Sequence, residues 1–401
     1  MLFEKEKVNF NSEELKMNFS DDELINRKYV SGEVRIVTEQ ARYPLDTIKT
    51  MIDSGKYKLN PDFQRRHRWS NEKKSRLMES FIMNVPIPPI FLYENEFSHY
   101  EVMDGLQRLT AIYDYYNDSY KLEGLKLWGE LNGRSYSELP EKVKRGIDRR
   151  YISSIILLQE SAKSDEEAQK MKQLVFERIN SGGVKLEPQE TRNALYDGKM
   201  NRLCIDLSEN KYLCSFLKIP VPNAENKNER DENENYRKMA DVEYVLRFFA
   251  MRQLEGYTGR KLNDFLDAYL IKANDFDDKL LKKLRCLYED TLEFAYKVFG
   301  EKAFYMFRKK EDINKEIINE KIKWNWYSKT TTTVYDPMMQ VLSELLPYKE
   351  ILINNRDKIR DEIKDFYKNN YHLFGGRNTN KSDIEKRIKE FKKFFEGFIK
   401  G

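Results

Sequence analysis

The pattern of apolar and polar positions divides the chain into an N-terminal part that mixes helices and strands and a C-terminal part of helices. In the N-terminal part the pattern predicts helices at 43–60 and 70–86, strands at 89–94 and 99–105, and a helix that opens at Gln107. An unbroken apolar run predicts a buried strand at 150–160, followed by a helix at 164–180 and another near Pro188. This alternation predicts an α+β domain.

The second half of the chain predicts an almost entirely helical domain. Amphipathic stretches predict helices at 238–255, 261–273, 276–299, 311–321, 334–345, 355–370 and 382–399. The charge-rich stretch "NAENKNERDENEN" at 223–235 predicts a polar loop or linker. We therefore expect four parts: a polar N-terminal arm at 1–32, an α+β domain at 33–222, the loop or linker at 223–235, and a helical domain at 236–401.

Composition narrows the class of protein. Charged residues make up 34% of the 401 residues, and the net charge is only +4, so any nucleic-acid surface must be a local patch. Three cysteines without Cys-x-x-Cys spacing indicate free thiols in a reducing compartment. No stretch is long and apolar enough for a membrane span or a secretion signal, so we expect a cytoplasmic protein that does not enter membranes.

The first candidate motif is "NPDFQRRHRWS" at 60–70, which places cations beside an aromatic ring. Arg65, Arg66 and Arg68 precede Trp69, and guanidinium groups bind phosphate through paired hydrogen bonds. The motif therefore predicts a phosphate contact. The alternative is a solvated basic loop with Trp69 in the core.

The second motif, "VMDGLQRLTAIYDYY" at 102–116, predicts a strand, a turn and a helix. The start of a helix offers unpaired backbone N–H groups and a partial positive charge, and Gly105 permits close backbone approach. Gln107 and Arg108 would lie in the first turn, and Asp104 would hold Mg²⁺ or fix an arginine. The alternative is a plain turn with a surface Gln-Arg pair.

The third motif, "FERINSGGVKLEPQETRNALYDG" at 176–198, predicts a tight helix exit at Asn180, followed by a new helix with Arg192 and Asn193. Taken alone, Asn-Ser-Gly-Gly is most often a helix C-cap. The motif is not a P-loop, because Gly-x-x-x-x-Gly-Lys-Ser/Thr occurs nowhere in the chain.

Together the three motifs resemble, in order and spacing, the N-terminal domain of GmrSD-type modification-dependent restriction enzymes. The motifs of that family are a Phe-Gln-Arg…Trp box, an Asp-Gly-Gln-Gln-Arg box and a Phe-x-x-x-Asn-x-x-Gly…Leu box. They stand here as "FQRRHRW", "DGLQRL" and "FERINSGGVKL". The resemblance is strong from about residue 40 to 200 and loose from 240 to 400.

This resemblance implies a ParB/sulfiredoxin-like fold and a nucleotide-binding component of prokaryotic anti-phage defence that hydrolyses GTP, ATP or UTP with Mg²⁺. The residues expected to act in catalysis are Asp104, Gln107 and Arg108, with Asp104 also at the metal. The residues expected to bind nucleotide phosphates are Gln64, Arg65, Arg68, Gly105, Asn180, Gly183 and Arg192.

Two departures from the family pattern qualify the expected activity. Leu106 stands where the family has its first glutamine, and leucine cannot orient a water molecule, so binding is a firmer expectation than hydrolysis. Many relatives cut DNA with a C-terminal His-Asn-His domain, but His372 is the only histidine after His99. We therefore expect a separate nuclease or effector as a partner. The alternatives are a DNA-binding module without turnover and a DNA nuclease that acts through the same pocket.

Overall fold

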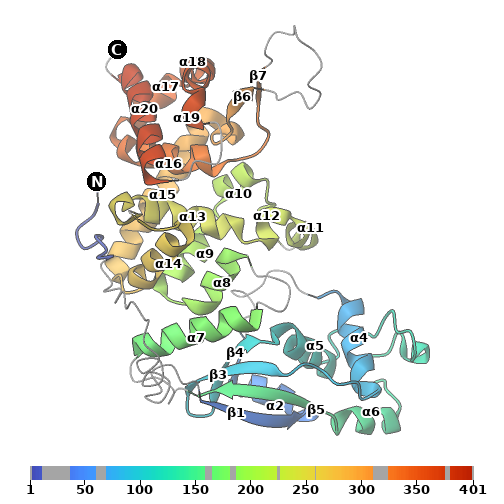
Figure 1. The fold of residues 1–401 in the computed structure, drawn as a ribbon. Coiled ribbons are helices and arrows are strands. Elements are labelled where there is room, and N and C mark those ends of the chain that lie inside the picture. The colour runs from blue at the N-terminus through green and yellow to red at the C-terminus, as the bar shows by residue number, and fades with distance from the viewer. Residues whose placement is uncertain are drawn as a thin grey trace, which may run out of the picture. The chain divides into compact units, whose positions relative to one another are not determined.

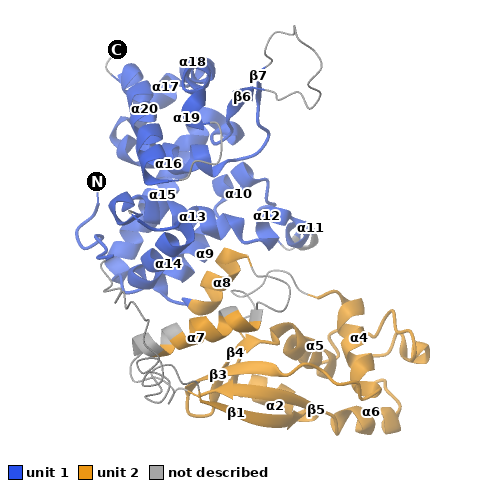
Figure 2. Cartoon of the chain, in the orientation of Figure 1, with its two compact units in different colours: residues 1–13, 196–401 blue, residues 14–195 orange. Residues whose placement is uncertain are grey.

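The structure is a computed structural model that describes residues 2–10, 37–59, 69–158, 165–180, 187–223, 226–257, 259–309, 324–374 and 380–399. The chain divides into two compact units (Figure 2). Residues 14–195 form one, which we call the α+β unit, and residues 1–13 with 196–401 form the other, which we call the helical unit. The division between Leu195 and Tyr196 falls earlier in the chain than the charge-rich stretch at 223–235.

The α+β unit is built on a five-stranded mixed sheet in the order β1-β5-β3-β4-β2 (Figure 1). Its strands are β1 Thr38–Pro44, β2 Tyr57–Lys58, β3 Ile90–Glu96, β4 His99–Asp104 and β5 Tyr151–Leu157. The β3–β5 and β2–β4 pairs are parallel, whereas the β1–β5 and β3–β4 pairs are antiparallel. The predicted mixture of helices and strands is confirmed.

Helices cover both faces of this sheet. The core on one face is shared with four helices: α2 Leu45–Asp53, α4 Asn71–Ile82, α5 Leu106–Tyr116 and α6 Glu141–Asp148. Leu92 and Val102 point into that core, so their neighbours Tyr93 and Glu101 face the other way. On that opposite face lies α7 Asp165–Asn180, which is followed by α8 Pro188–Leu195 (Figure 1).

Local signals in the sequence explain two boundaries of the α+β unit. Ser70 caps α4, because its hydroxyl accepts the Lys73 N–H at 3.3 Å. The helix expected at 43–60 ends at Asp53, since the chain turns at Gly55, with φ of +76°, and then adds β2 to the sheet. The sequence pattern does not predict β1, because this edge strand is mostly exposed and lacks an apolar alternation.

The helical unit consists of many helices and one two-stranded ribbon. Its longer helices are α9 Lys199–Ser208, α13 Ala240–Met251, α14 Leu262–Ala273, α15 Asp278–Phe299, α16 Thr332–Glu344, α18 Arg356–Asn369 and α20 Lys381–Ile399. The shorter elements are α10 Lys211–Leu217, α11 Lys227–Glu232, α12 Glu234–Arg237, α17 Lys349–Asn354, α19 Tyr371–Phe374, and the strands β6 Phe307–Lys309 and β7 Trp324–Trp326. None of the described helices is long and apolar enough to cross a membrane.

Six of the seven helices predicted after residue 236 are confirmed, and the seventh, at 311–321, lies outside the described residues. The expected polar loop at 223–235 instead contains α11 and α12, whose anchor is the buried Arg230 side chain. Its Nη1 donates to the Pro220 carbonyl at 2.9 Å. Of the expected N-terminal arm, residues 2–10 belong to the helical unit, where the buried Glu6 carboxylate accepts a hydrogen bond from Arg252 Nη2 at 2.8 Å.

A buried ion pair joins α13 to α16 in the helical unit. Arg247 Nε donates to Asp336 Oδ1 at 3.0 Å, and Nη2 of the same guanidinium donates to Oδ2. Both side chains are only 4% exposed. Because neither charge reaches water, Asp336 is compensated mainly by Arg247, whose Nη1 also lies 3.4 Å from the partly buried Glu243 carboxylate.

We expect Arg247→Met to lower the free energy of unfolding by about 3–5 kcal/mol, because it leaves the Asp336 carboxylate buried without its partner. Replacing both residues, as Arg247→Met with Asp336→Leu, should recover most of that loss. Chemical denaturation followed by circular dichroism measures both. The control is Arg285→Met, which removes a half-exposed ion pair with Asp206 and should lower the free energy of unfolding by no more than about 1 kcal/mol. If Arg247→Met lowered it by no more than this control, the importance of the buried pair would be contradicted.

Candidate functional site

The second motif forms the predicted strand, turn and helix. Strand β4 ends at Asp104, α5 begins at Leu106, and Gly105 between them has φ of +96° and ψ of 8°. A Cβ atom at residue 105 would lie 2.4 Å from Ile90 Cγ2. Both the left-handed backbone and the lack of space therefore require glycine at this turn.

Asp104 and Arg108 face each other across this turn. Arg108 Nη2 donates to Asp104 Oδ2 at 2.8 Å and to the Pro89 carbonyl at 3.2 Å. The Arg108 side chain is 16% exposed, so it is held largely out of water. Its Nε is buried and has no hydrogen-bond partner among the described residues. The guanidinium is thus fixed in place while part of its donor capacity is unused.

Gln107 links the second motif to the first. Its Oε1 accepts the backbone N–H of Trp69 at 3.0 Å, over a separation of 38 residues. Trp69 is the last residue of the arginine-rich box and packs, partly buried, against the core, with Lys73 Nζ 4.7 Å from its ring centre. The rest of that box, with Gln64, Arg65 and Arg68, lies outside the described residues.

The third motif is described only in part. Asn180 is the last residue of α7, but only its backbone belongs to the described part of the chain. Gly183 lies outside the described residues. Arg192 on α8 is 1% exposed, and its Nη1 donates to Gln189 Oε1 at 3.2 Å. Gln189 Nε2 in turn donates to Asn193 Oδ1 at 2.9 Å. Arg192 thus belongs to a buried polar cluster within α8, and its role as a phosphate ligand stays a prediction.

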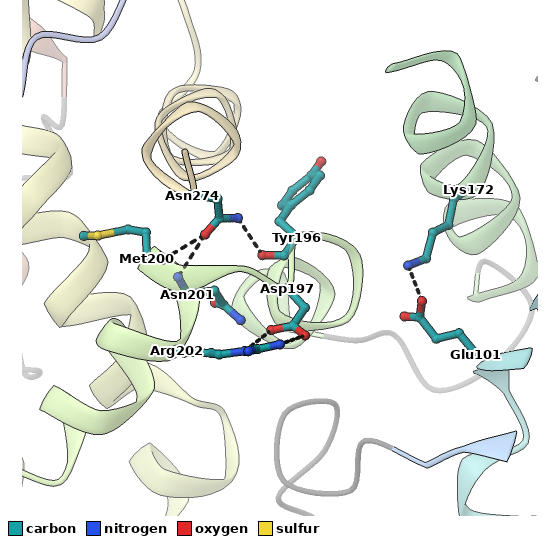
Figure 3. A network of polar contacts seen from close by, with 8 residues as sticks. All are labelled: Glu101, Lys172, Tyr196, Asp197, Met200, Asn201, Arg202 and Asn274. Atoms are coloured by element: carbon teal, nitrogen blue, oxygen red, sulfur yellow. Dashed lines mark hydrogen bonds and ion pairs between the residues drawn. The ribbon is translucent and has the colours of Figure 1, made fainter. Parts of the chain in front are cut away.

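A buried ion pair that no sequence motif predicts fastens α7 to the sheet. Lys172 Nζ lies 2.8 Å from Glu101 Oε2, with side-chain exposures of 8% and 14% (Figure 3). Glu101 stands three residues before Asp104 on β4, so the pair attaches the helix of the third motif to the strand of the second. The two residues are 71 positions apart, and no local pattern signals such a pairing.

A network of hydrogen bonds that no sequence motif predicts fixes the start of α9 in the helical unit (Figure 3). Asn274 Oδ1 accepts the backbone N–H groups of Met200 and Asn201, both at 3.1 Å. Its Nδ2 donates to the Tyr196 carbonyl at 3.0 Å. The side-chain amide of Asn274, on a distant part of the chain, therefore caps the start of α9. Gly198 occupies the N-cap position but has no side chain that could accept these N–H groups.

The described residues contain no group of three or more histidine, cysteine, aspartate or glutamate side chains that could hold a metal ion by themselves. Asp104 is therefore not part of such a group, and one of its oxygens is engaged by Arg108. A divalent cation there would need further oxygen ligands from a bound molecule.

Residues 48–196 match the family described as GmrSD restriction endonuclease, N-terminal domain. No curated protein and no solved structure is significantly similar to the chain. The matched segment includes the turn at Gly105, the Asp104–Arg108 pair and the Gln107–Trp69 hydrogen bond. Residues 48–196 of this chain therefore belong to the GmrSD restriction endonuclease N-terminal domain family.

Proposed function

We propose that the α+β unit binds a nucleoside triphosphate at the start of α5 and hydrolyses it, as a component of a prokaryotic restriction-type anti-phage defence system. The family of residues 48–196 supports the defence role. The nucleotide-binding role is supported by one observation above all, the hydrogen bond from the Trp69 N–H to Gln107 Oε1. It joins the end of the arginine-rich box to the first turn of α5.

The start of α5 suits a phosphate group for three reasons. The first-turn N–H groups of a helix have no partner within the helix and carry the positive end of its dipole. Arg108 is held at this turn by Asp104 and keeps a donor without a described partner. Arg68 and Arg65 precede Trp69 in the sequence and supply further guanidinium groups to the same box.

Each remaining predicted residue has a role in this proposal. Asp104 orients Arg108 and would hold Mg²⁺ only together with phosphate oxygens of the nucleotide, which is the usual coordination of Mg²⁺ at nucleotide sites. Gln107 positions the arginine-rich box through its carbonyl oxygen and keeps its amide N–H groups as donors. The predicted phosphate ligands Gln64, Asn180, Gly183 and Arg192 complete the proposed site.

The departure at Leu106 has a structural explanation in this unit. Leu106 is 7% exposed and belongs to the hydrophobic core. The side chain at this position thus points away from the proposed phosphate site, so the leucine removes no polar group from it. We propose that Gln107 and Arg108, rather than residue 106, serve the nucleotide.

We expect Arg108→Ala to weaken nucleotide binding by about 10- to 100-fold, because a hydrogen bond to a charged group contributes about 1.5–3 kcal/mol. Isothermal titration with GTP, ATP, UTP and CTP in the presence of Mg²⁺ measures the affinity. Arg145→Ala is the matched control, because that arginine is 78% exposed and pairs only with Glu141 among the described residues. Absence of binding by the wild type, or equal affinities of wild type and Arg108→Ala, would refute the assignment.

We expect Leu106→Gln to lower the free energy of unfolding by about 1–3 kcal/mol without raising the rate of phosphate release, because it buries an amide in an apolar core. Chemical denaturation measures the first effect and a phosphate-release assay with saturating nucleotide measures the second. A rate higher than that of the wild type would show that residue 106 reaches the site after all.

The two alternative activities make different predictions for DNA. With plasmid, Mg²⁺ and nucleotide present, the proposal predicts phosphate release and an intact plasmid. Cleavage that Arg108→Ala abolishes would identify a nuclease at this site instead. DNA binding that weakens steeply with salt, without phosphate release, would identify a binding module without turnover.

A further inference from the structure

The helical unit contains a hollow on α15 that the nucleotide proposal does not involve. Its volume is about 460 Å³, within the range of about 300–1,000 Å³ that is typical of ligand pockets. The floor is apolar and includes Phe3, Leu287 and Leu346. Lys279, Lys282 and Lys283 also line it, and all three are exposed on one face of the helix.

The three lysines give this hollow an excess of positive charge. Other cations of α15 are paired: Arg285 Nη2 lies 3.0 Å from Asp206 and Lys297 Nζ lies 3.1 Å from Glu293. Lys279, Lys282 and Lys283 have no carboxylate partner among the described residues, and one acidic residue, Asp290, lines the hollow further along the helix. An occupant with several carboxylates would therefore complement its charge.

The aromatic surface of the hollow is already engaged. Lys283 Nζ lies 5.8 Å and the Arg252 guanidinium 5.4 Å from the centre of the Phe3 ring. Arg252 is itself fixed by the Glu6 carboxylate. The other floor residues, Leu287 and Leu346, are aliphatic and offer no face for base stacking. The hollow therefore suits aliphatic side chains better than nucleic-acid bases.

We propose that this hollow is the docking site for an acidic, amphipathic segment of a partner protein. Apolar side chains of the segment pack on Leu287 and Leu346, while its carboxylates face the three lysines. The stretch of α15 from Lys279 to Asp290 rises about 16 Å, which corresponds to about three helical turns of the partner segment. Asp290 favours a neutral or basic residue at one end, so the charge pattern also sets the direction of docking.

Cys286 lines the same hollow and provides a direct reporter of its occupation. It is exposed, whereas Cys204 and Cys214 are buried, and burial raises the pKa of Cys214 to about 11. A neutral maleimide should therefore modify Cys286 first. The probe is a synthetic helical peptide of leucines and glutamates, added to the full chain while intact mass follows the modification. We expect this peptide to slow the modification of Cys286 by about fivefold or more.

Charge reversal makes the test specific. The variant Lys279→Glu/Lys282→Glu/Lys283→Glu should lose protection by the glutamate peptide and gain it from the same peptide with lysines in place of glutamates. The ratio of rates with and without peptide corrects for any change in the reactivity of the thiol itself. The matched control Lys272→Glu/Lys386→Glu/Lys389→Glu changes three exposed lysines that do not line the hollow and should behave as wild type.

Three results would overturn the proposal. One is the absence of protection by the glutamate peptide in the wild type. Another is equal protection in the wild type and the charge-reversed variant, because the lysines would then contribute nothing. The last is stronger protection by a single-stranded DNA of 12 nucleotides than by the glutamate peptide, which would assign the hollow to nucleic acid.

Discussion

At Gly105 the chain passes from β4 into α5 through a left-handed turn, in a space where a Cβ atom would come within 2.4 Å of Ile90. This steric constraint determines where the charged groups of the site lie. Because the turn is so tight, Asp104 on the strand and Arg108 on the helix meet at 2.8 Å. A wider connection would separate them, and the guanidinium would lose the carboxylate that fixes it.

Contacts that are distant in sequence then add the other motifs to this turn. The Gln107–Trp69 hydrogen bond brings the end of the arginine-rich box to the start of α5. The buried pair of Lys172 with Glu101 holds α7 on the sheet beside the strand that leads into the turn. The geometry of the site therefore depends on the order of the strands, in which β4 lies between β3 and β2, as much as on any single motif.

The sequence predicts those features whose causes lie within a few residues. The cap at Ser70 and the turn at Gly105 each follow from one short stretch. The pairing of Lys172 with Glu101 and the hydrogen bond from Trp69 to Gln107 depend on how the strands are ordered, which no local pattern encodes. Asp104 allows two interpretations from sequence; the structure shows its contact with Arg108, and its role at Mg²⁺ stays a prediction.

The central claim is that the first turn of α5 and Arg108 together receive a phosphate group. Nuclear magnetic resonance on the full chain, with glycine and arginine labelled in ¹⁵N, tests it most directly during titration with a non-hydrolysable nucleotide. The account predicts that the backbone N–H of Gly105 and the Nε–H of Arg108 shift together and saturably. Saturable shifts elsewhere, with both of these signals unchanged, would contradict it.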